Sequence, residues 1–190
     1  MQLISLNTAR AEVLRIDGRE VMSGIRKRPV DGPREVRPLG LEGDEQADPS
    51  VHGGLSKAVY AYPSEHYAFW RTVRAQAQVA GWDDALPWGA MGENLSIAGL
   101  LESDAWIGDV LVFPDCELAI SEPRYPCFKF NAVMGFNKAA KMMSQSGWCG
   151  FYLAVRKPGT LTAGQAFTVR PGPREVSIAE IFRSRGKGKD

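Results

Sequence analysis

The stretch ELAISEPRYPCFKF, residues 117–130, shows the pattern from which we predict the fold: a short apolar run followed at once by a proline-rich turn. We expect Glu117 to Ser121 to form a β-strand. Pro126 fixes its own φ and lacks a backbone donor, and Tyr125 is restricted to extended geometry because a proline follows it. The turn is therefore stiff, and it presents Cys127 from a defined loop.

Short strands of this kind recur along the chain between turn signals. Asp17-Gly18, for example, is a hairpin signal after an expected strand. The other strands are expected at residues 2–7, 12–16, 57–62, 92–97, 110–113, 151–155 and 165–169. Many short strands and few helices predict a mostly-β, barrel-like fold with a few peripheral α-helices. No repeat or linker interrupts the pattern, so we predict a single domain over residues 1–182 and a basic flexible tail over residues 183–190.

The strongest helix signal follows Pro63. Ser64 is the expected N-cap, and Gly81 is the expected end. Four residues at helical spacing are expected to face the core: Tyr67, Trp70, Val73 and Ala77. His66 lies in the first turn beside aromatic residues, and we interpret it as structural. Shorter helices are expected at residues 137–146 and 177–182.

The composition excludes several classes of protein. The chain has 190 residues, 44% hydrophobic and 24% charged, which is ordinary for a soluble globular protein. The formal net charge is +1 and the cations are scattered, so we expect no nucleic-acid partner. We find no signal peptide and no apolar run of membrane-spanning length, so we expect no membrane association and a cytoplasmic location. Three cysteines without close pairs favour a reducing compartment over a disulfide framework.

Cys127 is the candidate for chemistry in the proline-rich loop. Arg124 and Lys129 flank it, and they would lower the pKa of its thiol if they lie close, which favours the thiolate that attacks electrophiles or binds metal. The alternative is a buried cysteine that packs as a small hydrophobe. For Cys116 and Cys149, burial in the core is the expected role.

Two glycine-rich segments, residues 40–46 and 51–54, form a second unusual feature. So many glycines indicate a backbone that approaches another group closely or adopts positive φ. Successive amides in such turns can form an anion-binding nest, or the segments can be ordinary tight turns. Three consecutive cations, at residues 26–28, precede these segments, and we interpret them as a solvated edge.

The chain resembles a known family, the MOSC domains found at the C-terminus of molybdenum-cofactor sulfurases and in stand-alone proteins. It is most similar to the stand-alone, YiiM-like branch. The matching segments occur in the family's order, from about residue 23 to about residue 170: residues 40–46, 52–54 with 57–59, 62–63 with 65–67, 92–95 with 107–109, and 123–124 with 126–127. Each segment is short, and their combination carries the resemblance.

The resemblance implies a β-rich barrel-like fold that binds the molybdenum cofactor, with the Cys127 thiolate as a protein ligand to molybdenum. Arg124 lies in the family's R-x-P-C pattern and is the first candidate for the cofactor's phosphate. The further candidates for cofactor contacts are Lys57, Lys129, Glu93, Asn94, Asp44 and His52. For the YiiM-like branch the resemblance also implies reduction of N-hydroxylated compounds, such as hydroxylaminopurines and amidoximes, with electrons from a separate protein. Pyridoxal phosphate is not expected, because sulfurases carry that chemistry on another domain.

Two alternatives remain open from the sequence. One is a binding module that carries the molybdenum cofactor or sulfur, the latter as a persulfide on Cys127. The other is a metal-free cysteine hydrolase with His52 or His66 as the base. The hydrolase hypothesis lacks an apparent residue that would orient the histidine.

Overall fold

A computed structural model describes residues 1–47 and 53–186 of the chain. Among these residues, eight strands form the main sheet, in the order β13 (Thr168–Arg170), β9 (Val110–Val112), β10 (Glu117–Pro123), β11 (Phe151–Lys157), β7 (Val59–Pro63), β8 (Leu95–Ala98), β1 (Gln2–Thr8) and β4 (Arg28–Pro29). Neighbouring strands are antiparallel except β7 and β8. All five residues of β7 are buried, which suits its central place between β11 and β8.

The two ends of the main sheet approach each other. Gln2 in β1 forms an isolated bridge with Ala166, just before β13. The N–H of Leu3 donates to the Gln165 carbonyl at 2.9 Å, and the N–H of Phe167 donates to the Met1 carbonyl at 3.1 Å. Within the described residues the paired strands nevertheless form an open sheet, because this contact is a single bridge. The prediction of a mostly-β fold with a few helices is confirmed, but the strands of residues 1–47 and 53–186 do not close into a barrel.

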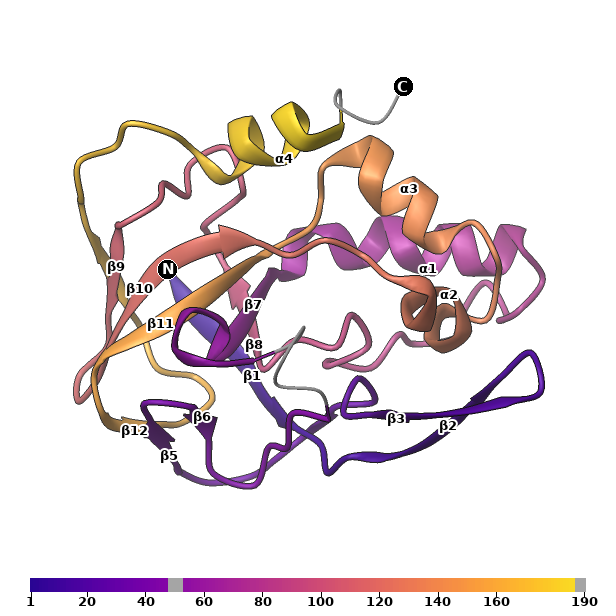
Figure 1. Ribbon diagram of the computed structural model, residues 1–190, viewed down its shortest axis with the longest axis horizontal. Coiled ribbons are helices and arrows are strands. Elements are labelled where there is room, and N and C mark those ends of the chain that lie inside the picture. Colours follow the sequence, from indigo (N-terminus) through magenta and orange to yellow (C-terminus); the bar gives the residue numbers. More distant parts are fainter. Residues whose placement is uncertain (48–52, 187–190) are drawn as a thin grey trace.

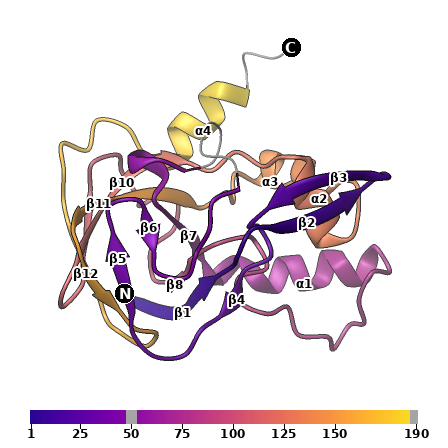
Figure 2. The same cartoon turned by 60° about the horizontal axis from the view of Figure 1, so that its bottom comes forward.

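Two smaller sheets extend the main one (Figure 1). One pairs β12 (Gly159–Leu161), β5 (Arg34–Arg37) and β6 (Gly40–Leu41), in that order. The other is the hairpin of β2 (Glu12–Ile16) and β3 (Arg19–Ser23), whose turn contains Asp17 with φ 49° and Gly18 with φ 75°. In both views the hairpin projects away from the main sheet toward the end where the helices lie (Figures 1 and 2).

Of the described α-helices, the first three lie on the side of the β2–β3 hairpin, and the last lies against β10 (Figure 1). After the 3-10 turn η1 (Leu55–Lys57) and β7, the turn η2 (Ser64–His66) leads into α1 (Tyr67–Gln76); α2 (Phe128–Met134), α3 (Ala139–Ser146) and α4 (Ile178–Gly186) follow later in the chain. Trp70 of α1 and Phe130 of α2 are both fully buried and pack edge to face, with ring centroids 5.4 Å apart. None of the described helices is long and apolar enough to cross a membrane.

Several expected details differ from the structure. The Ser64 side chain caps no helix; Pro63 occupies the N-cap position of η2. Ala77 is exposed because α1 ends one residue before it, at Gln76. The helix α2 is not among the expected elements, although its buried residues Phe130 and Met134 are four apart. The helix α4 continues to Gly186, so residues 183–186 of the expected tail are helical, and residues 187–190 lie outside the described residues.

Candidate functional site

An open pocket lies where the base of the β2–β3 hairpin meets the cysteine-bearing loop. The space between its walls, including the part open to solvent, is about 680 Å³. Six of the predicted site residues line it: Asp44, Lys57, Asn94, Arg124, Cys127 and Lys129. These residues are distant in sequence, so the fold brings most of the predicted site together. Ser23, Lys27, Tyr60 and Tyr152 also contribute to the walls.

Cys127 differs in environment from the other two cysteines. It is half-buried at the pocket wall, directly before α2, and its carbonyl accepts the N–H of Phe130 at 2.9 Å. Cys116 and Cys149 are fully buried in the core, as expected. Burial raises the pKa of the Cys116 thiol to about 12, and burial also raises the pKa of the Cys149 thiol. Cys127 is thus the cysteine whose thiol can meet a ligand.

Arg124 brings a buried positive charge to the pocket wall. The residue is 5% exposed, and its guanidinium lies over the rings of Tyr60 and Phe130, at 5.5 and 5.1 Å. Its Nη1 contacts the Met143 sulfur at 3.3 Å. No carboxylate of the described residues forms an ion pair with it. A buried cation without a carboxylate is costly unless an anion binds it.

The protonation state of Arg124 follows from the same surroundings. Burial disfavours its charge, but its pKa is raised above the ordinary value because Tyr60, Tyr152 and Cys127 surround it with groups that become negative on ionisation. The guanidinium therefore stays charged and presents a fixed fork of donors. Such a fork matches the oxygens of a phosphate.

Lysines line other parts of the pocket. Lys57 lies 3.6 Å from Glu122 and 5.9 Å from the centre of the Tyr152 ring. Lys129 donates from Nζ to the Met22 carbonyl at 3.1 Å, which links α2 to the β2–β3 hairpin. The pocket that contains Cys127 is thus also lined by Arg124 and these two lysines.

Lys27 and Asp44 form a buried ion pair that the sequence did not indicate. Their side chains are only 8% and 4% exposed, and Asp44 also accepts the N–H of Ala9 at 2.9 Å. The interpretation of residues 26–28 as a solvated edge is therefore wrong for Lys27, although Arg26 and Arg28 are exposed. Asp44 orders the chain beside the pocket, and its charge is balanced by Lys27.

Glu93 lies behind the pocket wall and stabilises the sheet. It is fully buried and is not among the lining residues. Its carboxylate accepts hydrogen bonds from four groups: the hydroxyls of Tyr67 and Ser96 and the N–H groups of Gly89 and Met91. Burial raises the pKa of Glu93, and these donors oppose the rise. The structure thus gives Glu93 a role in the fold and does not bring it to the pocket.

Asn94 reaches the pocket but uses its side chain to join two strands. Its Oδ1 accepts the N–H of Tyr60 at 3.1 Å, and its Nδ2 donates to the Asn7 carbonyl at 3.2 Å. Asn94 therefore ties β7 to β1 and fixes Tyr60 at the pocket wall.

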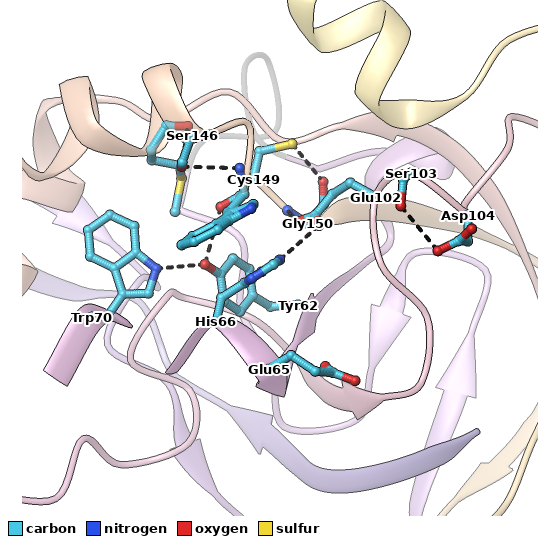
Figure 3. A network of polar contacts seen from close by, with 12 residues as sticks. Tyr62, Glu65, His66, Trp70, Glu102, Ser103, Asp104, Ser146, Cys149 and Gly150 are labelled. Carbon is cyan, nitrogen blue, oxygen red and sulfur yellow. Dashed lines mark hydrogen bonds and ion pairs between the residues drawn. The ribbon is translucent and has the colours of Figure 1, made fainter. Parts of the chain in front are cut away.

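A second polar network lies around His66 (Figure 3). His66 is 7% exposed, stacks on Trp148 with ring centroids 4.6 Å apart, and lies 2.9 Å from Glu102 through Nε2. Glu102 also accepts the N–H of Gly150 at 2.8 Å. His66 is buried and paired in this network, which agrees with the structural interpretation, and it is not among the residues that line the pocket of Cys127. Sequence reasoning missed Glu102, whose partners lie far from it in the chain.

The glycine-rich segments border the same pocket. Gly53 has φ 125° and lines the wall, and Gly54 has φ 82°, so positive φ is confirmed for this region. A side chain at Gly53 would collide with the Gln46 amide. His52, a predicted site residue, lies outside the described residues.

The fold and the pocket together define a β-rich protein with a pocket lined by a cysteine and several cationic side chains. Residues 48–168 match the family model described as the MOSC domain, and the chain belongs to this family. It is 37% identical over 159 residues to Protein YiiM of Escherichia coli, covering 83% of this chain and 68% of that protein. The crystal structure of YiiM from Geobacillus stearothermophilus superposes with a TM-score of 0.76 and 30% identity, over 97% of this chain and 83% of that one.

A further relative carries a name that indicates an activity. A protein of Gibberella moniliformis named "Reductase" is 34% identical over 173 residues, which cover 88% of this chain. The match covers only 30% of that protein, so most of that reductase lies outside the shared part.

Proposed function

We propose that this protein binds the molybdenum cofactor in the pocket beside Cys127 and reduces N-hydroxylated compounds such as hydroxylaminopurines and amidoximes. The observation that carries the proposal is Arg124, a buried cation that lacks a carboxylate partner in the described part of the chain and lines the pocket that contains Cys127. Membership of the MOSC family, which is associated with the molybdenum cofactor, supports it, as does the relative named as a reductase.

The pocket residues suit the chemical groups of that cofactor. Arg124 would hold the cofactor's phosphate through its guanidinium fork, with Lys57 and Lys129 adding positive charge nearby. The Cys127 thiolate would be the protein ligand to the metal, because soft thiolates suit metals that already carry sulfur ligands. The stiff proline turn and the first turn of α2 would hold the Cys127 sulfur in place.

When bound, the cofactor would supply a metal centre that accepts electrons and delivers them to the substrate. The overall reaction consumes two electrons and two protons, breaks the N–O bond of the substrate, and releases the reduced nitrogen compound and water. The electrons would come from a separate donor protein.

The test uses protein made in a host that synthesises the cofactor. We expect purified protein to contain molybdenum and to reduce hydroxylaminopurine or an amidoxime with reduced methyl viologen as donor. Cys127→Ala should lose the metal and the activity, whereas the control Cys116→Ala, which removes a buried thiol, should retain both. Full metal content and activity in Cys127→Ala would refute the proposal.

The same preparation distinguishes a carrier from a reductase. Protein that binds the cofactor but shows no turnover with any of these substrates would fit a cofactor carrier. An added sulfur atom on Cys127, detected by intact-mass spectrometry, in protein without molybdenum would fit a sulfur carrier.

A further inference from the structure

The chain around Cys127 has an unusual distribution of charge. No Asp or Glu occurs from residue 123 to residue 174, whereas eight Lys and Arg residues do. This acid-free segment contains the cysteine loop, α2 and α3. The overall charge of the chain is only +1, so acidic residues elsewhere balance this local excess.

Exposed cations lie on the outer surfaces of α3 and α4. Ala139 and Met143 face the core from α3, whereas Lys138 and Lys141 are exposed. On the last turn of α4, Arg183 and Arg185 are exposed. We call Lys138, Lys141, Arg183 and Arg185 the basic helical face.

Two acids lie at the start of α4, at the end remote from Arg185. Glu175 precedes the helix, and Glu180 is in its first turn. The pKa of Glu180 is lowered because its carboxylate accepts hydrogen bonds from the backbone N–H and the hydroxyl of Ser177. The charge of Arg183, three residues further along the helix, also lowers this pKa, so Glu180 offsets part of that charge.

Both helices pack against the loop that carries Cys127. Phe182 of α4 stacks on Tyr125 with ring centroids 5.2 Å apart, and the Arg185 guanidinium lies 4.6 Å from the same ring. Met143 of α3 contacts Arg124, the preceding residue of the loop. Both views show α3 and α4 beside each other (Figures 1 and 2). Tyr125 and Cys127 are two residues apart, about 7 Å along an extended chain.

We propose that the basic helical face is the docking site of an acidic electron-carrier protein. The proposal rests on the proposed function, which needs two electrons from outside the chain for each N–O bond broken. A cationic surface steers an acidic partner and orients it on contact. This surface is built on the same loop as Cys127, so a partner bound there would lie next to the pocket. Phe128, directly after Cys127 and 55% exposed, offers an apolar contact beside the cysteine.

A nucleic acid is the other polyanion that such a surface could attract. The acidic protein is favoured because α3 and α4, which carry these cations, both contact the loop of Cys127, whereas a nucleic-acid backbone needs cations spread along its path. Binding of duplex DNA is therefore one outcome of the test.

The first experiment measures binding without any turnover. Oxidised plant-type [2Fe–2S] ferredoxin and flavodoxin serve as acidic probes, titrated calorimetrically into the cofactor-free protein at low salt. We expect at least one carrier to bind, and the affinity to fall as salt is added. The variant Lys138→Glu/Lys141→Glu/Arg183→Glu should weaken this binding by about tenfold or more.

A matched control reverses three cations elsewhere. Arg19 lies at the hairpin turn, and Arg156 and Lys157 lie at the end of β11 that is remote from the cysteine loop; all three are exposed. Arg19→Glu/Arg156→Glu/Lys157→Glu makes the same change in net charge and should alter binding by less than about twofold. Equal losses in the two triple variants, no binding of either carrier by the native protein, or tighter binding of a DNA duplex of about 20 base pairs than of either carrier would overturn the proposal.

The second experiment separates this inference from the proposed function. Cofactor-loaded protein is assayed with reduced methyl viologen and, in parallel, with the reduced carrier protein. We expect the basic-face variant to keep its viologen-driven rate and to lose most of its carrier-driven rate. Absence of viologen-driven activity in the native protein would refute the proposed function. Normal viologen-driven activity with unchanged carrier-driven activity in the variant would refute the docking site alone.

Discussion

Glu93 and Arg124 are both buried charged residues, and both affect the pKa of Tyr60. The protein surrounds the two charges with different kinds of partner. Glu93 has no exposed surface and accepts hydrogen bonds from four donors of its own chain. Arg124 has aromatic faces and a methionine sulfur around it, and no carboxylate pairs with it among the described residues. The contrast separates a charge that holds the fold together from a charge that is available to a ligand.

The largest expected effect is the loss of stability when the Glu93 carboxylate is removed. Glu93→Ala leaves four buried donors without an acceptor, so we expect the free energy of unfolding to fall by about 3 kcal/mol or more, as measured by urea denaturation. Asp83→Ala, which removes an exposed carboxylate, should change it by less than about 0.5 kcal/mol. A loss of under about 1 kcal/mol for Glu93→Ala would show that its hydrogen bonds do not hold this part of the sheet.

A substitution of Arg124 should have the opposite effect, with little change in stability and a clear loss of cofactor affinity. Arg124→Met removes a buried cation but keeps an apolar side chain, so we expect the free energy of unfolding to stay within about 1 kcal/mol of the native value. Cofactor affinity should fall about 10- to 100-fold, because a charged hydrogen-bonding group is lost. Titration of the apoprotein with isolated cofactor, followed by intrinsic fluorescence, measures this affinity. Arg156→Met, at an exposed site, is the control and should change neither quantity.

A substitution in the polar network around His66 should lower stability, as at Glu93, but by a smaller amount. Glu102→Gln keeps an acceptor for the Gly150 N–H but weakens the contact with His66, so we expect a loss of about 1–2 kcal/mol in stability. Cofactor affinity should change by less than about twofold. Asp104→Asn, at an exposed residue beside this network (Figure 3), is the control and should change neither stability nor cofactor affinity. A tenfold loss of affinity in Glu102→Gln would place this network within the binding site.

The smallest expected effect concerns an exposed pair remote from both clusters. A hydrogen bond and ion pair with Arg170 lower the pKa of Glu117 below its ordinary 4.5. A lowered folded-state pKa stabilises the protein above the unfolded value, and this contribution is lost as the pH falls through the folded-state pKa. Glu117→Gln should therefore lower Tm slightly near neutral pH and less in strong acid, and added salt should shrink the difference. An equal Tm shift at both pH values would contradict the assigned cause.

Much of the β-structure could be predicted because its signals are local. The strands at residues 2–8 and 12–16 and the Asp17-Gly18 turn follow from alternation and from turn chemistry over a few residues. The same holds for Trp70, whose helical spacing predicts burial. The boundaries of α1 were less predictable, since the ends of a helix depend on contacts with the rest of the fold.

The part of the candidate site that lies in the short cysteine-containing motif could be predicted from the sequence. Cys127 and Arg124 lie in one short segment, and the structure brings them to one pocket with Lys57 and Lys129. The burial of Lys27 could not be predicted, because only its tertiary contact with Asp44 distinguishes it from its two neighbouring arginines. A residue of a family motif need not line the pocket. Glu93 does not, because the sequence does not show whether a side chain points into the pocket or into the core behind it.

Gly150 lies between the polar network around His66 and the pocket wall at Tyr60, and it limits which substitutions this region can accept. Its N–H is bound by Glu102, and a methyl group on its Cα would collide with the Ala61 carbonyl and meet the Tyr60 ring at 2.8 Å. The Tyr60 ring in turn lies under Arg124. Added bulk at residue 150 would therefore displace the Tyr60 ring beneath the Arg124 guanidinium, so new specificity has to be built on the opposite wall, where Ser23, Gly24 and Ile25 at the base of the hairpin line the pocket.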